Sequence, residues 1–221
     1  QEPVFRASLD ESAAILSTLI DQPLHAILFP AEGAPSLLDD MRYAQPAIFA
    51  LDVALARLWA SWGIEPIAVS GHSLGEYAAA CMAGVFSLTD GLKLVAARGR
   101  LMQSLPVDGE MVTVFADEAR VSAAIAPFAA DVALAAVNGP DTCVISGRRE
   151  PVRQVLERLR AERIRNRPLP IAQASHSPLI EPILDAFTAI AASITYHAPT
   201  VPVVSCLTWG EVSAAEIGTP D

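Results

Sequence analysis

A serine between two glycines is the first residue in this chain that could do chemistry. Gly71-His72-Ser73-Leu74-Gly75 matches G-x-S-x-G, with a short apolar run before it and an alanine-rich segment after it. In that context the motif predicts a nucleophile elbow, a sharp turn that presents the serine at a helix N-terminus. The free N–H groups there stabilise an oxyanion, and Leu74 would supply the first donor. A plain strand-to-helix connection is the alternative interpretation.

A serine hydroxyl is a weak nucleophile unless a base takes its proton, so the histidines come next. His72 adjoins the serine and is expected to diverge from it, which favours packing or orientation. His25 and His197 lie in proline-containing segments that suggest only a surface position. His176 lies in a Ser-His-Ser-Pro turn, where Pro178 can start a helix. His176 is therefore the candidate base, with a helix cap as the alternative.

An arginine interrupts a leucine stripe in a predicted helix. Arg98 follows Leu94 by four residues and precedes Leu101 by three, and Gly99 beside it would let another group approach closely. A guanidinium in such a stripe needs an anionic partner, because a buried unpaired charge costs several kcal/mol. The partner is either an internal Asp or Glu or the carboxylate of a substrate, which a guanidinium binds bidentately.

The elements that must position these residues follow from apolar periodicity. Ile48, Leu51, Leu55, Leu58 and Trp59 recur at helical spacing, which predicts a helix over 46–62 that Gly63 ends. A strand over 67–70 leads into the glycine-rich turn. Helices over 76–84 and 87–105 follow it. This order predicts an α/β fold with an α/β-hydrolase-like large lobe around the elbow.

From residue 111 the pattern changes to short, regularly spaced elements in the order βαββαβ. That order is typical of the ferredoxin-like split unit. We expect a ferredoxin-like small subdomain over 109–171, inserted into a discontinuous large subdomain of 1–108 and 172–221. The individual elements are strands at 111–115, 132–137, 142–146 and 167–171, and helices at 117–128 and 150–161.

Composition excludes several function classes. The formal net charge of the 221 residues is −10 and no basic stripe is present, so nucleic acid is not an expected partner. No apolar run is long enough to span a membrane, and the start of the chain does not resemble a signal peptide. The odd number of cysteines indicates a reducing cytoplasm. No pair of cysteines or histidines has the spacing of metal ligands. The cysteines are Cys81, Cys143 and Cys206.

Several motifs together resemble one family. They closely resemble, in order and spacing, the acyltransferase domains of modular polyketide synthases and the malonyl-CoA:acyl-carrier-protein transacylases. The motifs are MRYAQPAIFAL at 41–51, GHSLGEY at 71–77, AARG at 96–99, NGP at 138–140 with VISG at 144–147, and SHSP at 175–178.

This resemblance implies a ping-pong acyl transfer with no permanently bound cofactor. Ser73, with His176 as base, would attack the thioester of a malonyl-type coenzyme A, and the phosphopantetheine thiol of an acyl carrier protein would then take the acyl group. Arg98 would hold the free carboxylate of the acyl group. A backbone carbonyl at Cys206, where the family usually has asparagine, would orient the histidine. Further substrate contacts are implied for Gln45, His72, Asn138, Gln173 and Ser175.

The resemblance also leads to expectations about extent and substrate. The family begins with a glycine- and glutamine-rich motif that supplies a second oxyanion donor, and nothing in this chain corresponds to it. We therefore expect the chain to be an excerpt, truncated at both ends, of a multidomain synthase. Leu74 resembles malonyl-selective members, whereas Gln173-Ala174-Ser175-His176 resembles methylmalonyl-selective ones. Ser175 leaves room for a methyl group, which favours methylmalonyl.

Two other classes of function share some of these features. An α/β-hydrolase-type esterase or thioesterase would have the same elbow, but a hydrolase of neutral esters needs no carboxylate clamp such as Arg98. A non-catalytic scaffold domain of a synthase would keep the fold without turnover. Acyl labelling of the serine would distinguish these classes.

Overall fold

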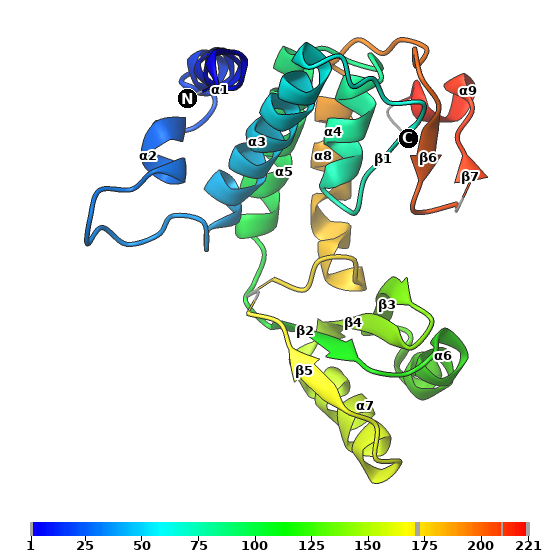
Figure 1. The fold of residues 1–221 in the computed structure, drawn as a ribbon. Helices are drawn as coiled ribbons and strands as arrows, with labels where there is room; N and C mark the ends of the chain where they lie inside the picture. Colours follow the sequence, from blue (N-terminus) through cyan, green and yellow to red (C-terminus); the bar gives the residue numbers. More distant parts are fainter. Residues whose placement is uncertain (1, 171–172, 209, 220–221) are drawn as a thin grey trace. The chain divides into compact units, whose positions relative to one another are not determined.

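The computed structural model describes residues 2–170, 173–208 and 210–219. The chain forms two compact units (Figure 1). The first comprises Gln1–Leu101 with Ala186–Asp221, and the second comprises Met102–Asp185. Within the described residues, no helix is both long enough and apolar enough to cross a membrane.

The first unit surrounds a small sheet with helices. Strand β1 pairs in parallel with β6, and β6 pairs antiparallel with β7. The strand–turn–helix unit of β1 and α4 is the part that carries the elbow, as predicted for an α/β-hydrolase-like lobe. The elements are α1 (Pro3–Leu16), α2 (Leu24–Leu28), α3 (Met41–Ser61), β1 (Val69–Ser70), α4 (Gly75–Met82), α5 (Leu88–Gln103), α8 (Leu184–Ala191), β6 (Val203–Ser205), β7 (Gly210–Glu211) and α9 (Ala214–Ile217).

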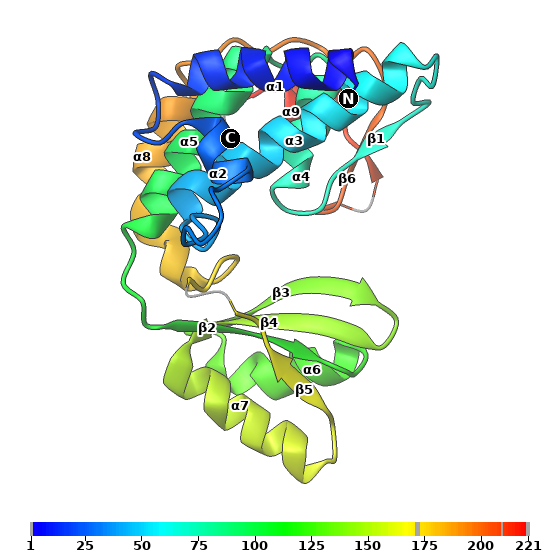
Figure 2. The ribbon, with the colours of Figure 1, turned by 60° about the vertical axis from the view of Figure 1, so that its left-hand side comes forward.

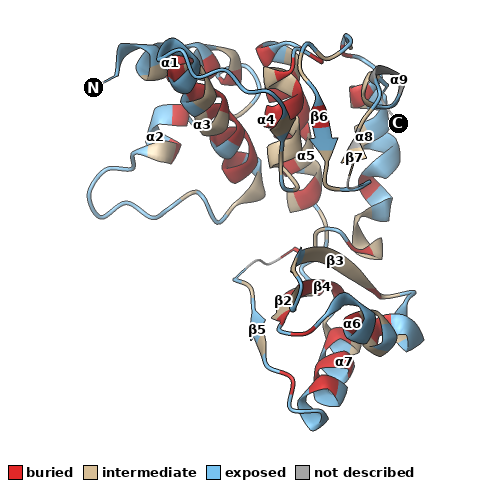
Figure 3. Cartoon of the chain, turned by 45° about the vertical axis from the view of Figure 1, so that its right-hand side comes forward, coloured by how far each residue is buried: buried red, intermediate tan, exposed pale blue. Residues whose placement is uncertain are grey.

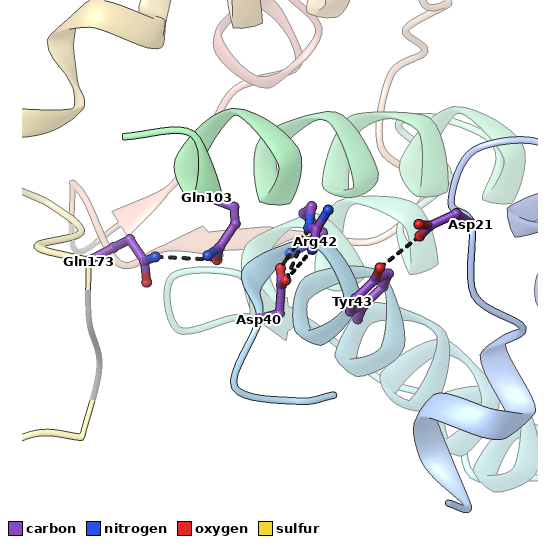
Figure 4. Close-up of polar contacts among 6 residues, drawn as sticks. All are labelled: Asp21, Asp40, Arg42, Tyr43, Gln103 and Gln173. Atoms are coloured by element: carbon purple, nitrogen blue, oxygen red, sulfur yellow. Dashed lines mark hydrogen bonds and ion pairs between the residues drawn. The ribbon is translucent and has the colours of Figure 1, made fainter. Parts of the chain in front are cut away.

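Helix α3 begins five residues earlier than predicted. Asp40 caps it by accepting a hydrogen bond from the backbone N–H of Arg42 at 2.9 Å, and its carboxylate also pairs with the Arg42 guanidinium (Figure 4). Pro46, predicted as the start, lies inside the helix. The cap satisfies an otherwise unpaired N–H of the first turn, so the helix can start there.

The face that α3 buries also differs from the predicted one. Of the five apolar residues used for the prediction, only Leu58 is buried, while Ile48, Leu55 and Trp59 are 40–51% exposed. Figure 3 shows buried residues along α3. Many of these buried residues are alanines. Small side chains let neighbouring helices approach closely. Because alanine is only weakly hydrophobic, the spacing of apolar residues in the sequence does not identify this face as the buried one. Its fully buried members are Ala47, Phe49, Ala50, Val53 and Ala54.

Helix α1 was not predicted from the sequence. It packs against α3 and buries two serines along with two leucines. Ser12 donates to the backbone carbonyl of Ser8 at 3.0 Å, and the Ser8 hydroxyl accepts from Arg57 at 3.3 Å. Because both buried hydroxyls are hydrogen-bonded, the helix can bury serines at positions where a helical pattern of apolar residues would be expected. The sequence pattern therefore did not indicate this helix.

The strand before the elbow is shorter than predicted. Only Val69 and Ser70 pair with β6, opposite Val203 and Val204. Ile67, predicted as part of the strand, is 94% exposed. The apolar run therefore predicts too long a strand here, because a residue joins a sheet only where a neighbouring strand is present to hydrogen-bond with its backbone.

The second unit confirms the predicted βαββαβ order. Its four strands form an antiparallel sheet in the order β3-β4-β2-β5, which places the strands of each split β-α-β unit on either side of a third. The elements are β2 (Gly109–Val114), α6 (Glu118–Ile125), the 3₁₀ helix η1 (Ala126–Phe128), β3 (Val132–Gly139), β4 (Thr142–Arg148), α7 (Arg149–Ala161), β5 (Asn166–Pro168) and the 3₁₀ helix η2 (Pro178–Ile183).

Helices α6 and α7 cover one face of this sheet (Figure 2). They bury a core of branched side chains, among them Val112, Ile145 and Leu159. The predicted insertion 109–171 lies within the second unit, which also includes residues beyond it because η2 packs against β4. Residues 171 and 172, at the end of the predicted last strand, lie outside the described residues.

Candidate active site

The backbone at Ser73 has the shape that the elbow motif predicts. Ser73 has φ 51°, in the left-handed region that a side chain rarely adopts. Two residues earlier, a Cβ on Gly71 would overlap the backbone of Gly75 and Glu76. The turn is therefore tight enough to require a glycine, and it lifts a non-glycine residue into a strained conformation between β1 and α4.

The backbone N–H groups around the N-terminus of α4 differ in whether they are hydrogen-bonded. The N–H groups of Gly75 and Glu76 turn back to the carbonyls of His72 and Ser73, at 2.9 and 3.1 Å. The N–H of Leu74 has no acceptor within the described part of the chain. This N–H is adjacent to the serine and lies at the positive end of a helix dipole, so it suits the predicted role of oxyanion donor.

A carboxylate in the first turn of α4 ties the elbow to β6, which the sequence analysis missed. Oε1 of Glu76 accepts hydrogen bonds from the Cys206 N–H at 2.9 Å and from the Ser205 hydroxyl at 3.1 Å. The predicted orienting residue Cys206 therefore lies next to the elbow, with its N–H bound. The sequence did contain a signal for this contact, the acidic Glu76 directly after G-x-S-x-G, because the helix dipole favours a carboxylate in the first turn.

Arg98 lies beside Gln45 and has no acidic partner among the residues that the structure describes. Its Nη1 donates to Oε1 of Gln45 at 2.8 Å. No ion pair among the described residues includes Arg98, although its side chain is half-buried. Of the two partners considered from the sequence, the internal salt bridge is absent from the described residues. The other partner considered from the sequence, a substrate carboxylate, stays a prediction.

Close packing of two helices brings Arg98 to Gln45. A Cβ on Gly99 would overlap the backbone carbonyl of Met41, so only glycine permits this approach of α5 to the start of α3. Gln45 is 3% exposed, and its Nε2 contacts the sulfur of Met41 at 3.7 Å. The amide is therefore held with its oxygen toward the guanidinium.

In the second unit, His176 lies on an equally unusual turn. It has φ 59° and is exposed. The buried Ser177 hydroxyl donates to the carbonyl of Ala174 at 2.7 Å and accepts from the N–H of Leu179 at 3.3 Å. Pro178 begins η2 as predicted. One serine therefore closes the turn that carries His176 and caps the following helix.

The turn of His176 is anchored by its preceding residues. Gln173 is 4% exposed, and its Nε2 donates to Oε1 of Gln103 at 3.2 Å (Figure 4). Ala174 fills the space beside Gly109 so closely that a Cβ on Gly109 would overlap it. The bond to Gln103 anchors the side-chain amide of Gln173. The predicted substrate contact of Gln173 stays a prediction.

The predicted site residues fall into two groups. Ser73, Leu74, Gln45, Arg98, His72 and Cys206 belong to the first unit, and Asn138, Gln173, Ser175 and His176 belong to the second. Asn138 is exposed at an irregularity near the end of β3, where the register with β4 shifts. Within the described residues, no group of three or more His, Cys, Asp or Glu side chains could hold a metal ion.

Curated relatives match nearly the whole length of this chain. It is 46% identical over 219 residues to "Polyketide synthase GfsA" of Streptomyces halstedii, an alignment that covers 97% of the chain and 3% of the synthase. The chain thus matches a small part of a much longer protein.

Solved structures are similar in fold as well as in sequence. The acyltransferase domain from the second module of the salinomycin polyketide synthase is 46% identical, with a TM-score of 0.90 over 99% of this chain and 51% of that one. The malonyl CoA-acyl carrier protein transacylase of Coxiella burnetii is 30% identical, with a TM-score of 0.86 over 97% of this chain and 71% of that one. This chain spans about half of the salinomycin domain's length.

The family model described as "Acyl transferase domain" matches residues 1–218. This match covers nearly all of the chain, including the elbow, Arg98 and the histidine turn. The resemblance stated from the sequence motifs is thereby confirmed, and the chain belongs to the acyl transferase domain family.

Proposed function

We propose that this acyltransferase domain moves a malonyl-type acyl group from coenzyme A to the phosphopantetheine thiol of an acyl carrier protein. His176 takes the proton of Ser73 as the serine oxygen bonds to the thioester carbon. The carbon–sulfur bond then breaks, and the proton passes to the coenzyme A sulfur. In the second half, the carrier thiol gives its proton to His176 as its sulfur bonds to the ester carbon. The ester bond between that carbon and the Ser73 oxygen then breaks, and the Ser73 oxygen regains the proton.

Backbone strain supports the assignment of these two residues. Among the described residues, Ser73, Arg163 and His176 are the non-glycine residues with positive φ. Arg163 has an ordinary explanation, because it follows the end of α7, where left-handed residues are common. Ser73 and His176 lie in turns between regular elements and carry side chains that can react, and strain of this kind concentrates at functional sites.

The charge of Arg98 carries the proposal that the acyl group bears a carboxylate. A half-buried guanidinium without an acidic partner in the described chain is costly unless an anion joins it. A malonyl-type group offers a carboxylate two bonds from its thioester carbon. The solved Coxiella burnetii relative is called a malonyl CoA-acyl carrier protein transacylase, which agrees with this substrate class.

Within this class we propose a preference for methylmalonyl. Ser175, directly before the candidate base, is small and partly exposed, so the turn offers room beside the acyl group's α-carbon. A single methyl group contributes about 1–3 kcal/mol to such discrimination. Competition between malonyl- and methylmalonyl-coenzyme A for one enzyme sample tests this preference, and a strong malonyl preference would refute it.

The main test is the acylation of Ser73 followed by intact mass. We expect the wild type to gain one malonyl-type group and to pass it to a pantetheine thiol faster than to water. Ser73→Ala should gain none, and Ser17→Ala, which removes an exposed hydroxyl, should label normally. Arg98→Ala should slow acylation by malonyl-type thioesters while sparing or improving acetyl transfer, because only the former needs the guanidinium.

Each competing function gives its own result in that experiment. Hydrolysis of the acyl-enzyme as fast as transfer to the thiol would identify a thioesterase. An unlabelled wild type would support a scaffold domain without turnover. Equal losses for malonyl and acetyl groups in Arg98→Ala would show that Arg98 is only structural.

A further inference from the structure

The hydrogen bond to Gln45 does not by itself fix the plane of the Arg98 guanidinium. A single N–H···O contact leaves the group able to rotate about that bond, whereas bidentate binding of a carboxylate needs a defined plane. The structure supplies a second contact. The Cζ of Arg98 lies over the ring of Tyr77, 5.8 Å from its centroid. This distance is within the range of a cation–π interaction.

Tyr77 is placed to link the arginine with the nucleophile. It lies in the first turn of α4, four residues after Ser73, and its backbone N–H donates to the carbonyl of Leu74 at 3.1 Å. Burial raises the pKa of the Tyr77 phenol, with the Arg98 charge acting in the opposite direction. The ring is therefore neutral at physiological pH and presents its π face to the cation.

The ring of Tyr77 is itself held in orientation. The Phe187 ring of α8 meets it edge-on, with centroids 6.5 Å apart and an interplanar angle of 72°. Edge-to-face packing of this kind favours one ring orientation. The guanidinium thus contacts a fixed amide oxygen from α3 and a fixed ring from α4.

We propose that Tyr77 is a positioning residue for Arg98 and thereby a determinant of the preference for carboxylated over neutral acyl groups. This inference rests on the proposed function, because it assigns Tyr77 to the same site. Gln45 and Tyr77 together restrict the guanidinium, so that its remaining N–H donors are oriented before the substrate arrives. Pre-organisation of this type lowers the entropy lost on binding.

The test compares Tyr77→Leu, Tyr77→Met and Tyr77→Phe with the wild-type protein. The readout is the ratio of Ser73 acylation rates with malonyl- and acetyl-coenzyme A, which does not depend on how much of a sample is folded. Leu and Met remove the π face, and the ratio should fall by about 2- to 30-fold. Phe keeps the face and should keep most of the ratio.

Tyr196 offers a matched control in the same unit. It also packs edge-on against a phenylalanine, Phe86, with centroids 6.4 Å apart and an angle of 84°, and its hydroxyl donates to the carbonyl of Ala191. Tyr196→Leu should cost comparable stability and leave the ratio unchanged. A fall in the ratio for Tyr196→Leu equal to that for Tyr77→Leu would show a general packing effect and overturn the inference.

A double variant shows whether Tyr77 acts through Arg98. In an Arg98→Ala background, Tyr77→Leu should change the ratio no further, because the guanidinium it positions is gone. An additional fall of the same size as in the wild type would overturn the inference. An unchanged ratio for Tyr77→Leu beside a lowered ratio for Arg98→Ala would also overturn it while leaving the proposed function intact. If wild-type Ser73 took up no acyl group, the proposed function itself would fail.

Discussion

The turns that carry Ser73 and His176 have the same backbone feature but are held in place by different means. Both residues have φ near 50–60°. The Ser73 turn is fixed by backbone sterics, since a Cβ on Gly71 would overlap the backbone of Gly75 and Glu76. The His176 turn is fixed by side chains, above all the hydroxyl of Ser177.

This difference explains why one turn is easier to recognise than the other. A turn that depends on backbone contact demands glycines at fixed spacing, so its sequence is restricted. A turn that depends on a hydroxyl cap and on distant anchors can be made by several residue types. The comparison predicts that the two turns respond differently to small substitutions.

Gly71→Ala should produce the largest effect on stability. The added methyl group would overlap main-chain atoms that cannot move without opening the elbow, so we expect a loss of about 4 kcal/mol or more. Urea denaturation measures it. Gly75→Ala is the matched control, because a Cβ there meets nothing within 4 Å, and it should stay within about 1 kcal/mol of the wild type. Equal losses for both variants would contradict the steric explanation.

His176→Ala and His176→Asn should come next, with a loss of acylation rate of about 10²-fold or more. Asparagine adopts the left-handed conformation readily, so it keeps the turn while removing the imidazole. Stopped-flow release of coenzyme A measures the rate, and His197→Ala serves as control. Near-normal acylation by His176→Asn would mean that the residue shapes the turn and is not the base.

Ser177→Ala should have the smallest effect, a destabilisation of about 0.5–2 kcal/mol through loss of the helix cap. The variant removes the bonds to Ala174 and Leu179 that close the turn. Urea denaturation measures the stability, and Ser175→Ala is the control because that residue is partly exposed. Unchanged stability in Ser177→Ala would show that the anchors at Gln173 and Ala174 suffice.

The sequence predicted most of the elements and little of how they pack. The βαββαβ order in the second unit follows from alternating periodicity and turn residues, and it is observed. The wrong face of α3 and the absence of a prediction for α1 have one cause. Both helices bury small residues, Ala47 and Ser12 among them, whose side chains add little to a hydrophobic pattern. Burial at such positions depends on the partner helix.

The sequence by itself determined the glycine-flanked serine, the family and the split strand order, because each depends on local sterics or on a motif with fixed spacing. Only the tertiary structure decided the environment of Arg98. Its neighbours Gln45 and Tyr77 come from two other helices, and the absence of an acidic partner within the described residues is a property of how those helices pack. Side-chain neighbours far apart in sequence are set by packing, which no local pattern encodes.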